Sequence, residues 1–161
     1  MGAYHEESKA TMNIDIRLCT EDEELRHIVN MAERHPYPEY DCEFSGYVVA
    51  LLELIKNPMV RMWIAYEDEK PVGYLIAIRQ KGLRNQISII DIYFEPSHRG
   101  MNLIVDLIIK VRDWAREDKA LRVQWTSKMS NIKWEKILGG AVDGDFEIKV
   151  GEYRVLEWEV V

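Results

Sequence analysis

The chain has 161 residues, 47% of them hydrophobic and 30% charged, with a formal net charge of -7. These values are typical of one soluble domain with a single hydrophobic core. No apolar run reaches the roughly 18 residues that a membrane span needs, and the N-terminus lacks the apolar segment of a signal peptide. The acidic balance argues against nucleic acid as a partner, because binding phosphates requires clustered Lys and Arg.

The cysteines and histidines give no sign of a disulfide or a metal site. Cys19 and Cys42 lie far apart and in no paired motif. We expect reduced thiols, which favours a cytoplasmic location. The histidines lack metal-ligand spacing with each other and with the cysteines, so we expect no metal.

Helical periodicity follows a polar, unpatterned N-terminal tail at residues 1–11 and a short alternating strand. The sequence TEDE at residues 20–23 predicts a capping box, in which the Thr20 hydroxyl and the Glu23 carboxylate cap the start of a helix. That helix, and a second one over residues 44–56, each end before a proline.

Alternating apolar and polar residues dominate the rest of the chain and predict strands separated by turns. One amphipathic helix with Ile104 and Leu107 on its apolar side interrupts them, and a short helix is predicted over residues 131–138. The order β-α-α-β-β-β-α-β-α-β-β predicts an α/β fold with a mixed sheet, in a single domain of residues 12–161. The predicted strands are residues 12–18, 60–66, 71–80, 86–94, 121–127, 145–150 and 153–161.

The sequence FEPSHRG at residues 94–100 joins a predicted strand to the amphipathic helix through a turn marked by proline. Such a junction points backbone N–H groups and the positive end of a helix dipole at one place, which favours phosphate. Together with the order of elements, this stretch resembles the GNAT superfamily of N-acetyltransferases, over about residues 12–161. The resemblance implies a GNAT fold that uses acetyl-coenzyme A as acyl donor.

The phosphate turn departs from the family's pattern, Arg/Gln-x-x-Gly-x-Gly/Ala. Arg99 matches it, whereas Asn102 and Ile104 stand at the two small-residue positions. Asn tolerates unusual backbone angles, but the β-branched Ile104 would crowd the cofactor. The alternative is that Ile104 belongs to the apolar stripe of the helix. The cofactor contacts that the resemblance implies are Phe94, Arg99, Gly100, Met101, Asn102, Leu103, Ile104 and Asn131.

Acetyl transfer to an amine needs a base, a donor to the oxyanion and an acid for the departing thiolate. The resemblance implies that the base is a carboxylate on or near the strand of residues 86–94, where Asp91 and Glu95 are the candidates. An aspartate in an apolar strand is unusual, although Asp91 facing solvent or pairing with an arginine stays an alternative. The family's usual acid, a Tyr on the last helix, is absent, and the nearest aromatic residue is Trp134.

The segment between the first two helices mixes aromatic and acidic side chains. His35, Tyr37, Tyr40 and Asp41 suit a cationic acceptor, a small-molecule or peptide amine, through cation–π contacts and charge pairing. The alternative is a solvated loop whose tyrosines cover the edge of the core. The sequence leaves a homodimer open.

Two function classes follow from these patterns. The first is an acyl-coenzyme A-dependent N-acyltransferase that acetylates an amine. The second is a catalytically inactive GNAT-fold binding or assembly module, which Ile104 and the missing Tyr would mark. A dinucleotide-binding domain is disfavoured because the chain has no G-x-G-x-x-G. We favour the enzyme, on an analogy of fold.

Overall fold

The structure is a computed structural model that describes residues 13–34, 44–82, 84–99, 103–127, 146–150 and 154–159. The order of elements predicted from the sequence is confirmed over these residues, and the predicted helix at residues 131–138 lies outside them. The elements are β1 (Ile14–Leu18), α2 (Asp22–Glu33), α3 (Phe44–Leu54), β2 (Val60–Glu67), β3 (Lys70–Gln80), β4 (Gln86–Phe94), the 3-10 helix η1 (Pro96–His98), α4 (Leu103–Glu117), β5 (Arg122–Ser127), β6 (Phe146–Val150) and β7 (Arg154–Glu159).

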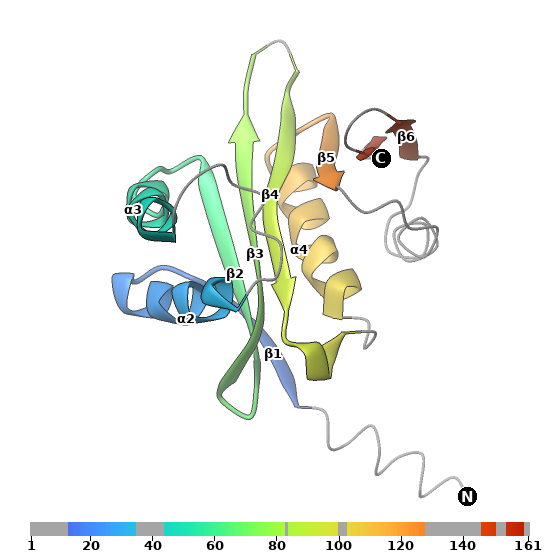
Figure 1. Cartoon of the computed structure of the whole chain (residues 1–161). Coiled ribbons are helices and arrows are strands. Elements are labelled where there is room, and N and C mark those ends of the chain that lie inside the picture. Colours follow the sequence, from blue (N-terminus) through green and yellow to red (C-terminus); the bar gives the residue numbers. More distant parts are fainter. Residues whose placement is uncertain are drawn as a thin grey trace, which may run out of the picture.

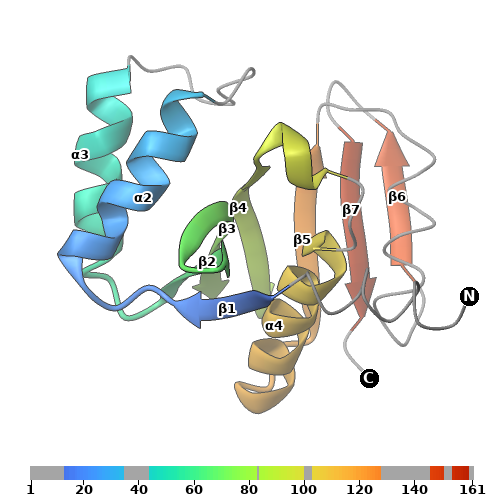
Figure 2. The same ribbon diagram turned by 90° about the horizontal axis from the view of Figure 1, so that it is seen from below.

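The described strands form one seven-stranded sheet in the order β1-β2-β3-β4-β5-β7-β6. Neighbouring strands are antiparallel except β4 and β5, which run parallel and are connected through α4. A parallel pair needs such a crossover because its strands start at the same edge of the sheet. The prediction of a mixed sheet is therefore confirmed. Helices α2 and α3 lie on one face of the sheet and α4 lies on the other (Figure 1), and Figure 2 shows β7 and β6 beyond β5.

Each face of the sheet buries a hydrophobic cluster of its own. On the face of α4, the helix packs against alternate residues of β2, β3 and β4, and Trp114 meets Trp63 edge to face. On the opposite face, buried residues of α2 and α3 cover the other alternate residues of these strands. Among the described residues, no helix is long and apolar enough to cross a membrane.

The capping box of α2 lies one residue later than the sequence analysis predicts. The Glu24 carboxylate, not that of Glu23, accepts the backbone N–H groups of Thr20 (3.2 Å) and Glu21 (3.1 Å). The backbone N–H of Cys19 still bonds to β2, at 2.7 Å from the Met62 carbonyl oxygen, so the chain leaves the sheet later and the helix starts at Asp22.

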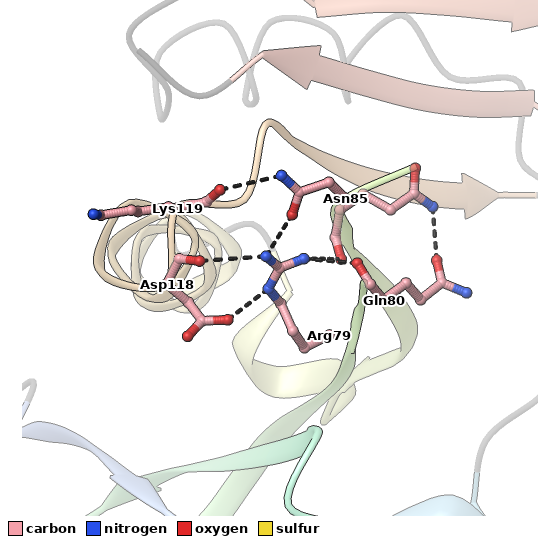
Figure 3. Close-up of polar contacts among 6 residues, drawn as sticks. Arg79, Gln80, Asn85, Asp118 and Lys119 are labelled. Atoms are coloured by element: carbon pink, nitrogen blue, oxygen red, sulfur yellow. Dashed lines mark hydrogen bonds and ion pairs between the residues drawn. The ribbon is translucent and has the colours of Figure 1, made fainter. Parts of the chain in front are cut away.

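A buried guanidinium fastens the β3–β4 hairpin to the end of α4 (Figure 3). Arg79 is only 5% exposed. Its Nε donates to the Asp118 carboxylate (2.6 Å), and its Nη1 donates to the backbone carbonyls of Gln80 (2.6 Å) and Gln86 (3.2 Å). Its Nη2 donates to the Asn85 side chain (2.5 Å) and to the Asp118 carbonyl (3.3 Å). This buried charge is thus surrounded by acceptors, as burial of a guanidinium requires.

Candidate active site

A β-bulge on β4 decides which side chains face α2 and α3. Ile76 pairs with Asp91 and Ala77 pairs with Ile89, so Ile90 is an extra residue on β4. Before the bulge, Ile89 packs on the face of α4, whereas both Ile90 and Asp91 belong to the opposite face. A bulge shifts the alternation of a strand by one residue. As a result Asp91 shares a face with Tyr93, although odd-numbered residues before the bulge point the other way.

Asp91 is buried, with 3% exposure, and its carboxylate is hydrogen-bonded to β3. The Tyr74 hydroxyl donates to Oδ2 of Asp91 at 2.6 Å. The alternative in which Asp91 faces solvent is therefore wrong. The Tyr74 hydroxyl, on the neighbouring strand, supplies the hydrogen bond that a buried carboxylate needs.

The second candidate base, Glu95, follows β4 directly and belongs to a different set of contacts. Its side chain is 17% exposed and forms an ion pair with the Arg34 guanidinium. The Tyr93 hydroxyl donates to the Glu95 carboxylate at 3.2 Å. Burial, and after it the charge of Glu95, raises the pKa of Tyr93, while the hydrogen bond to Glu95 raises the pKa of Arg34. Glu95 is thus a paired carboxylate rather than the solvated one expected at a turn.

Sequence reasoning did not find Arg34 or Tyr74. The Arg34–Glu95 pair joins residues 61 positions apart, and Tyr74 reaches Asp91 across 17 positions. No spacing in the sequence connects them. The relevant feature in the sequence is an arginine at the end of the first predicted helix, directly before a proline-rich segment. This feature does not specify a partner.

The parallel pair β4–β5 separates at the same bulge. Pairing covers Gln86 to Ile89 on β4 and ends at Trp125 on β5. Over residues 90–94, β4 has no strand partner on its β5 side among the described residues. Backbone groups on a strand edge need partners, and along this stretch no strand among the described residues supplies them. Figure 2 shows that β4 and β5 lie over the crossover helix α4.

The turn after β4 places Arg99 beside the end of this edge. The η1 turn begins at Pro96, and Arg99 Nε donates to the Phe94 carbonyl oxygen at 3.1 Å. The guanidinium carbon of Arg99 lies 5.6 Å from the centre of the Tyr93 ring. Arg99 is exposed, and its terminal nitrogens have no hydrogen-bond partner among the described residues. They are therefore available to an anion.

The start of α4 distinguishes the two interpretations of Ile104. Helix α4 begins at Leu103, and Ile104 is 6% exposed inside the cluster on the α4 face, with Leu107 and Ile108. The Ile104 side chain is thus a core side chain, as the second interpretation expects. Gly100, Met101 and Asn102 lie outside the described residues. What this part of the structure offers a phosphate is the backbone N–H groups of the first turn of α4.

The GNAT acetyltransferase family model matches residues 20–134, which is more than half of the chain. The chain belongs to the GNAT family. The protein is accordingly an N-acetyltransferase of this family. No curated protein matches the chain significantly in sequence.

Solved GNAT structures share the fold of this chain at low sequence identity. A GNAT-family acetyltransferase from Streptococcus pneumoniae superposes with a TM-score of 0.69 and 12% identity, covering 92% of this chain and 100% of the other. A mutant of the spermidine N-acetyltransferase SpeG from Vibrio cholerae gives 0.68 and 14%, covering 91% and 92%. The PaiA N-acetyltransferase from Thermoplasma acidophilum, in complex with coenzyme A, gives 0.66 and 13%, covering 90% and 99%.

Four of the predicted site residues, Asp91, Phe94, Glu95 and Arg99, lie within the last residues of β4 and the turn after it, where Asp91 and Glu95 have separate sets of contacts and Arg99 bonds to Phe94. No group of three or more His, Cys, Asp or Glu side chains there is arranged to hold a metal ion. The expected acceptor residues and the expected contact on the last helix are not among the described residues: His35, Tyr37, Tyr40, Asp41 and Asn131.

Proposed function

We propose that this GNAT enzyme transfers the acetyl group of acetyl-coenzyme A to a cationic amine, with Asp91 as the general base. The observation that carries the proposal is the position of Asp91. Its carboxylate is buried at the bulge where β4 leaves β5, on the face opposite α4, and accepts a hydrogen bond from Tyr74. A buried and hydrogen-bonded carboxylate beside an unpaired strand edge is a candidate for proton transfer.

The chemistry asks for a base because an alkyl ammonium has a pKa of about 10.4. One proton leaves the nitrogen for the carboxylate, directly or through water, and the nitrogen lone pair then attacks the thioester carbonyl. The C–N bond forms and the carbonyl oxygen becomes an oxyanion. When this tetrahedral intermediate collapses, the C–S bond breaks, and the departing thiolate takes up the second proton that the nitrogen loses. We assign stabilisation of the oxyanion to a backbone N–H of β4 on the side where no strand among the described residues pairs with residues 90–94.

The donor fits the turn that follows the same end of β4. We assign the pyrophosphate of acetyl-coenzyme A to the Arg99 guanidinium and to the backbone N–H groups at the start of α4. The terminal nitrogens of Arg99, which have no hydrogen-bond partner in the described part of the chain, and the helix dipole support this assignment. The Phe94 ring, buried against Gly73, would form the floor beneath the turn.

A cationic acceptor is favoured by the charge of the chain and by its relatives. The net charge is -7, and both candidate bases are carboxylates. Several of the structures with the same fold are spermidine N-acetyltransferases. We therefore propose a polyamine or another amine with more than one positive charge, to be tested first with spermidine.

Asp91→Asn tests the base. The change keeps the size and removes the basicity, so turnover of acetyl-coenzyme A with a panel of amines should fall by roughly 10²–10⁴. The affinity for coenzyme A, measured by calorimetry, should persist, and Glu95→Gln serves as the comparison. Wild-type turnover in Asp91→Asn, with a loss in Glu95→Gln, would move the role of base to Glu95. Binding of coenzyme A by a wild-type protein that acetylates no amine would favour the binding module instead.

A further inference from the structure

The Tyr74 hydroxyl donates a short hydrogen bond to the proposed base, Asp91. The oxygen–oxygen distance is 2.6 Å, and Tyr74 is fully buried. An O–H donor to an ionised carboxylate typically lies at about 2.5–2.7 Å. The geometry is therefore that of a hydrogen bond to a charged acceptor.

The position of Tyr74 follows from the pairing of β3 with β4. Tyr74 pairs with Tyr93, and its neighbour on the same face, Ile76, pairs with Asp91. The Tyr74 ring thus starts opposite Tyr93 and reaches diagonally to the carboxylate. The ring centres of Tyr74 and Tyr93 are 5.9 Å apart, which fixes the tyrosine ring from the other side.

The titratable and charged groups on this face come from each element packed there. Helix α3 adds no charged group to this face: it packs Leu51 there, and its one acidic residue, Glu53, is exposed. Among the described residues, the titratable and charged groups on the remaining elements around this cluster are Arg17 and Cys19 on and after β1, Glu24, His27 and Arg34 on and after α2, Tyr66 on β2, and Tyr93, Glu95 and Arg99 on and after β4.

We propose that Tyr74 is a positioning residue for Asp91, and that its hydroxyl orients the carboxylate and keeps it ionised for proton transfer. This inference rests on the proposed role of Asp91 as base. A donor to the charged form of an acid favours that form, and a buried carboxylate that loses a donor becomes harder to ionise. Tyr74 is fully buried and its hydroxyl donates to Asp91, so its effect would pass through that carboxylate.

Tyr74→Phe removes only the hydroxyl, and Tyr66→Phe is the matched control. Tyr66 is a buried tyrosine of the same cluster, and its hydroxyl has no hydrogen-bond partner among the described residues. The first readout needs no acceptor: the side-chain carboxyl carbons of ¹³C-labelled aspartate are titrated by NMR, and Asp91→Asn assigns the Asp91 signal. The midpoint in Tyr74→Phe should move up by about one to two pH units, and the midpoint in Tyr66→Phe should stay.

The second readout is the pH profile of kcat at saturating acetyl-coenzyme A and spermidine, where ionisation of the free substrates does not enter. Its acid limb should move in Tyr74→Phe by the same amount as the NMR midpoint. Site-specific 3-fluorotyrosine at position 74 has a more acidic hydroxyl and keeps the fold, so it should move the midpoint in the opposite direction. This variant decides the question if Tyr74→Phe does not fold.

The outcomes distinguish a failure of the Tyr74 inference from a failure of Asp91 as the proposed base. A midpoint that is unchanged in both position-74 variants overturns the inference. A moved midpoint with an unmoved acid limb overturns it as well, because Tyr74 would then tune an Asp91 carboxylate whose ionisation does not govern turnover. Full turnover in Asp91→Asn, in contrast, rejects the proposed base whatever the Tyr74 variants do.

Discussion

Gly73 on β3 is a residue whose missing side chain shapes the site. It pairs with Phe94, and a Cβ placed on it would lie 2.8 Å from the Phe94 ring and 2.9 Å from the Tyr93 carbonyl oxygen. Real Cβ atoms do not come this close, and a strand backbone cannot move away as a flexible side chain can. The absence of a side chain therefore lets the end of β4 lie against β3 directly before the phosphate turn.

We expect Gly73→Ala to lower stability by about 1–3 kcal/mol through overpacking, and to weaken coenzyme A binding because Phe94 and the turn after it must shift. Urea unfolding and calorimetry measure the two effects. Gly82→Ala is the control: its φ is +110° and nothing lies within 4 Å of the added Cβ. Strain should cost a comparable amount there, with unchanged affinity. Equal losses of affinity in both variants would show that lower stability alone is responsible.

Arg99 is the other single residue on which the donor site depends. Arg99→Ala removes a charge-assisted contact worth about 1.5–3 kcal/mol, so the coenzyme A dissociation constant should rise roughly ten- to a hundredfold. Arg84→Ala removes an exposed arginine before the start of β4 and should leave the dissociation constant unchanged. Equal coenzyme A affinity in wild type and Arg99→Ala would reject the assignment of the pyrophosphate.

At the scale of elements, α4 is a core helix whose first turn also borders the proposed phosphate site. Ile104 is 6% exposed and packs with Leu107 in the cluster on the α4 face. Ile104→Ala should therefore cost about 2–5 kcal/mol of stability, without tighter coenzyme A binding. Thermal unfolding and titration with coenzyme A measure both quantities. Tighter binding with little loss of stability would revive the interpretation that Ile104 crowds the phosphates.

The far end of α4 is held by Arg79 (Figure 3). Arg79→Met would leave the carbonyl oxygens of Gln80 and of buried Gln86 without this donor, and should lower stability by at least about 1–3 kcal/mol. Asp118→Asn is the milder change, because the Asp118 side chain is 38% exposed and its ion pair is screened by solvent.

The pH dependence of the Asp118 contact has a definite sign. The Arg79 hydrogen bond lowers the pKa of Asp118 below its ordinary value. Its contribution is thus present above the unfolded-state pKa and is lost as the pH falls through the folded-state pKa. The stability difference between wild type and Asp118→Asn should close in acid, which urea unfolding at several pH values measures. A difference that is constant with pH would mean that the carboxylate contributes through packing alone.

The strands and helices could be predicted because each follows a local period, and Gln86–Phe94 is bounded as the alternation predicts. The bulge at Ile90 could not, since every residue from Ile87 to Ile90 except Ser88 is apolar and suits either face. The face of the sheet on which the Asp91 side chain lies is therefore determined by the pairing of β4 with β3, which the sequence does not specify. The contacts of Asp91 with Tyr74 and of Glu95 with Arg34 are likewise tertiary, and the capping box moved by one residue because β1 pairing continues to Cys19.

At the scale of the whole molecule, the proposed donor site and the two candidate bases lie on opposite faces of the sheet. Helix α4 covers one face and begins at the proposed donor turn, whereas α2 and α3 cover the face that carries Asp91 and Glu95 (Figure 1). The proposed donor turn and the two carboxylates both lie at the end of β4, beyond the point where β4 stops pairing with β5. An acyl donor on the α4 side and an amine on the other side could thus approach one reaction centre from opposite directions.

The net charge of the protein should then affect how fast the amine acceptor binds. A net charge of -7 attracts a cationic acceptor and accelerates its encounter with the protein, an effect that salt screens. With acetyl-coenzyme A saturating, kcat/KM for a polyamine such as spermidine should fall by about tenfold between roughly 10 and 200 mM NaCl. A singly charged amine of similar length should lose less, since attraction scales with the charge of the acceptor. The value of kcat at saturating amine should stay level, because the field speeds encounter rather than chemistry. The same salt dependence for both amines would mean that the acceptor is selected by contacts in the site and not by the field of the protein.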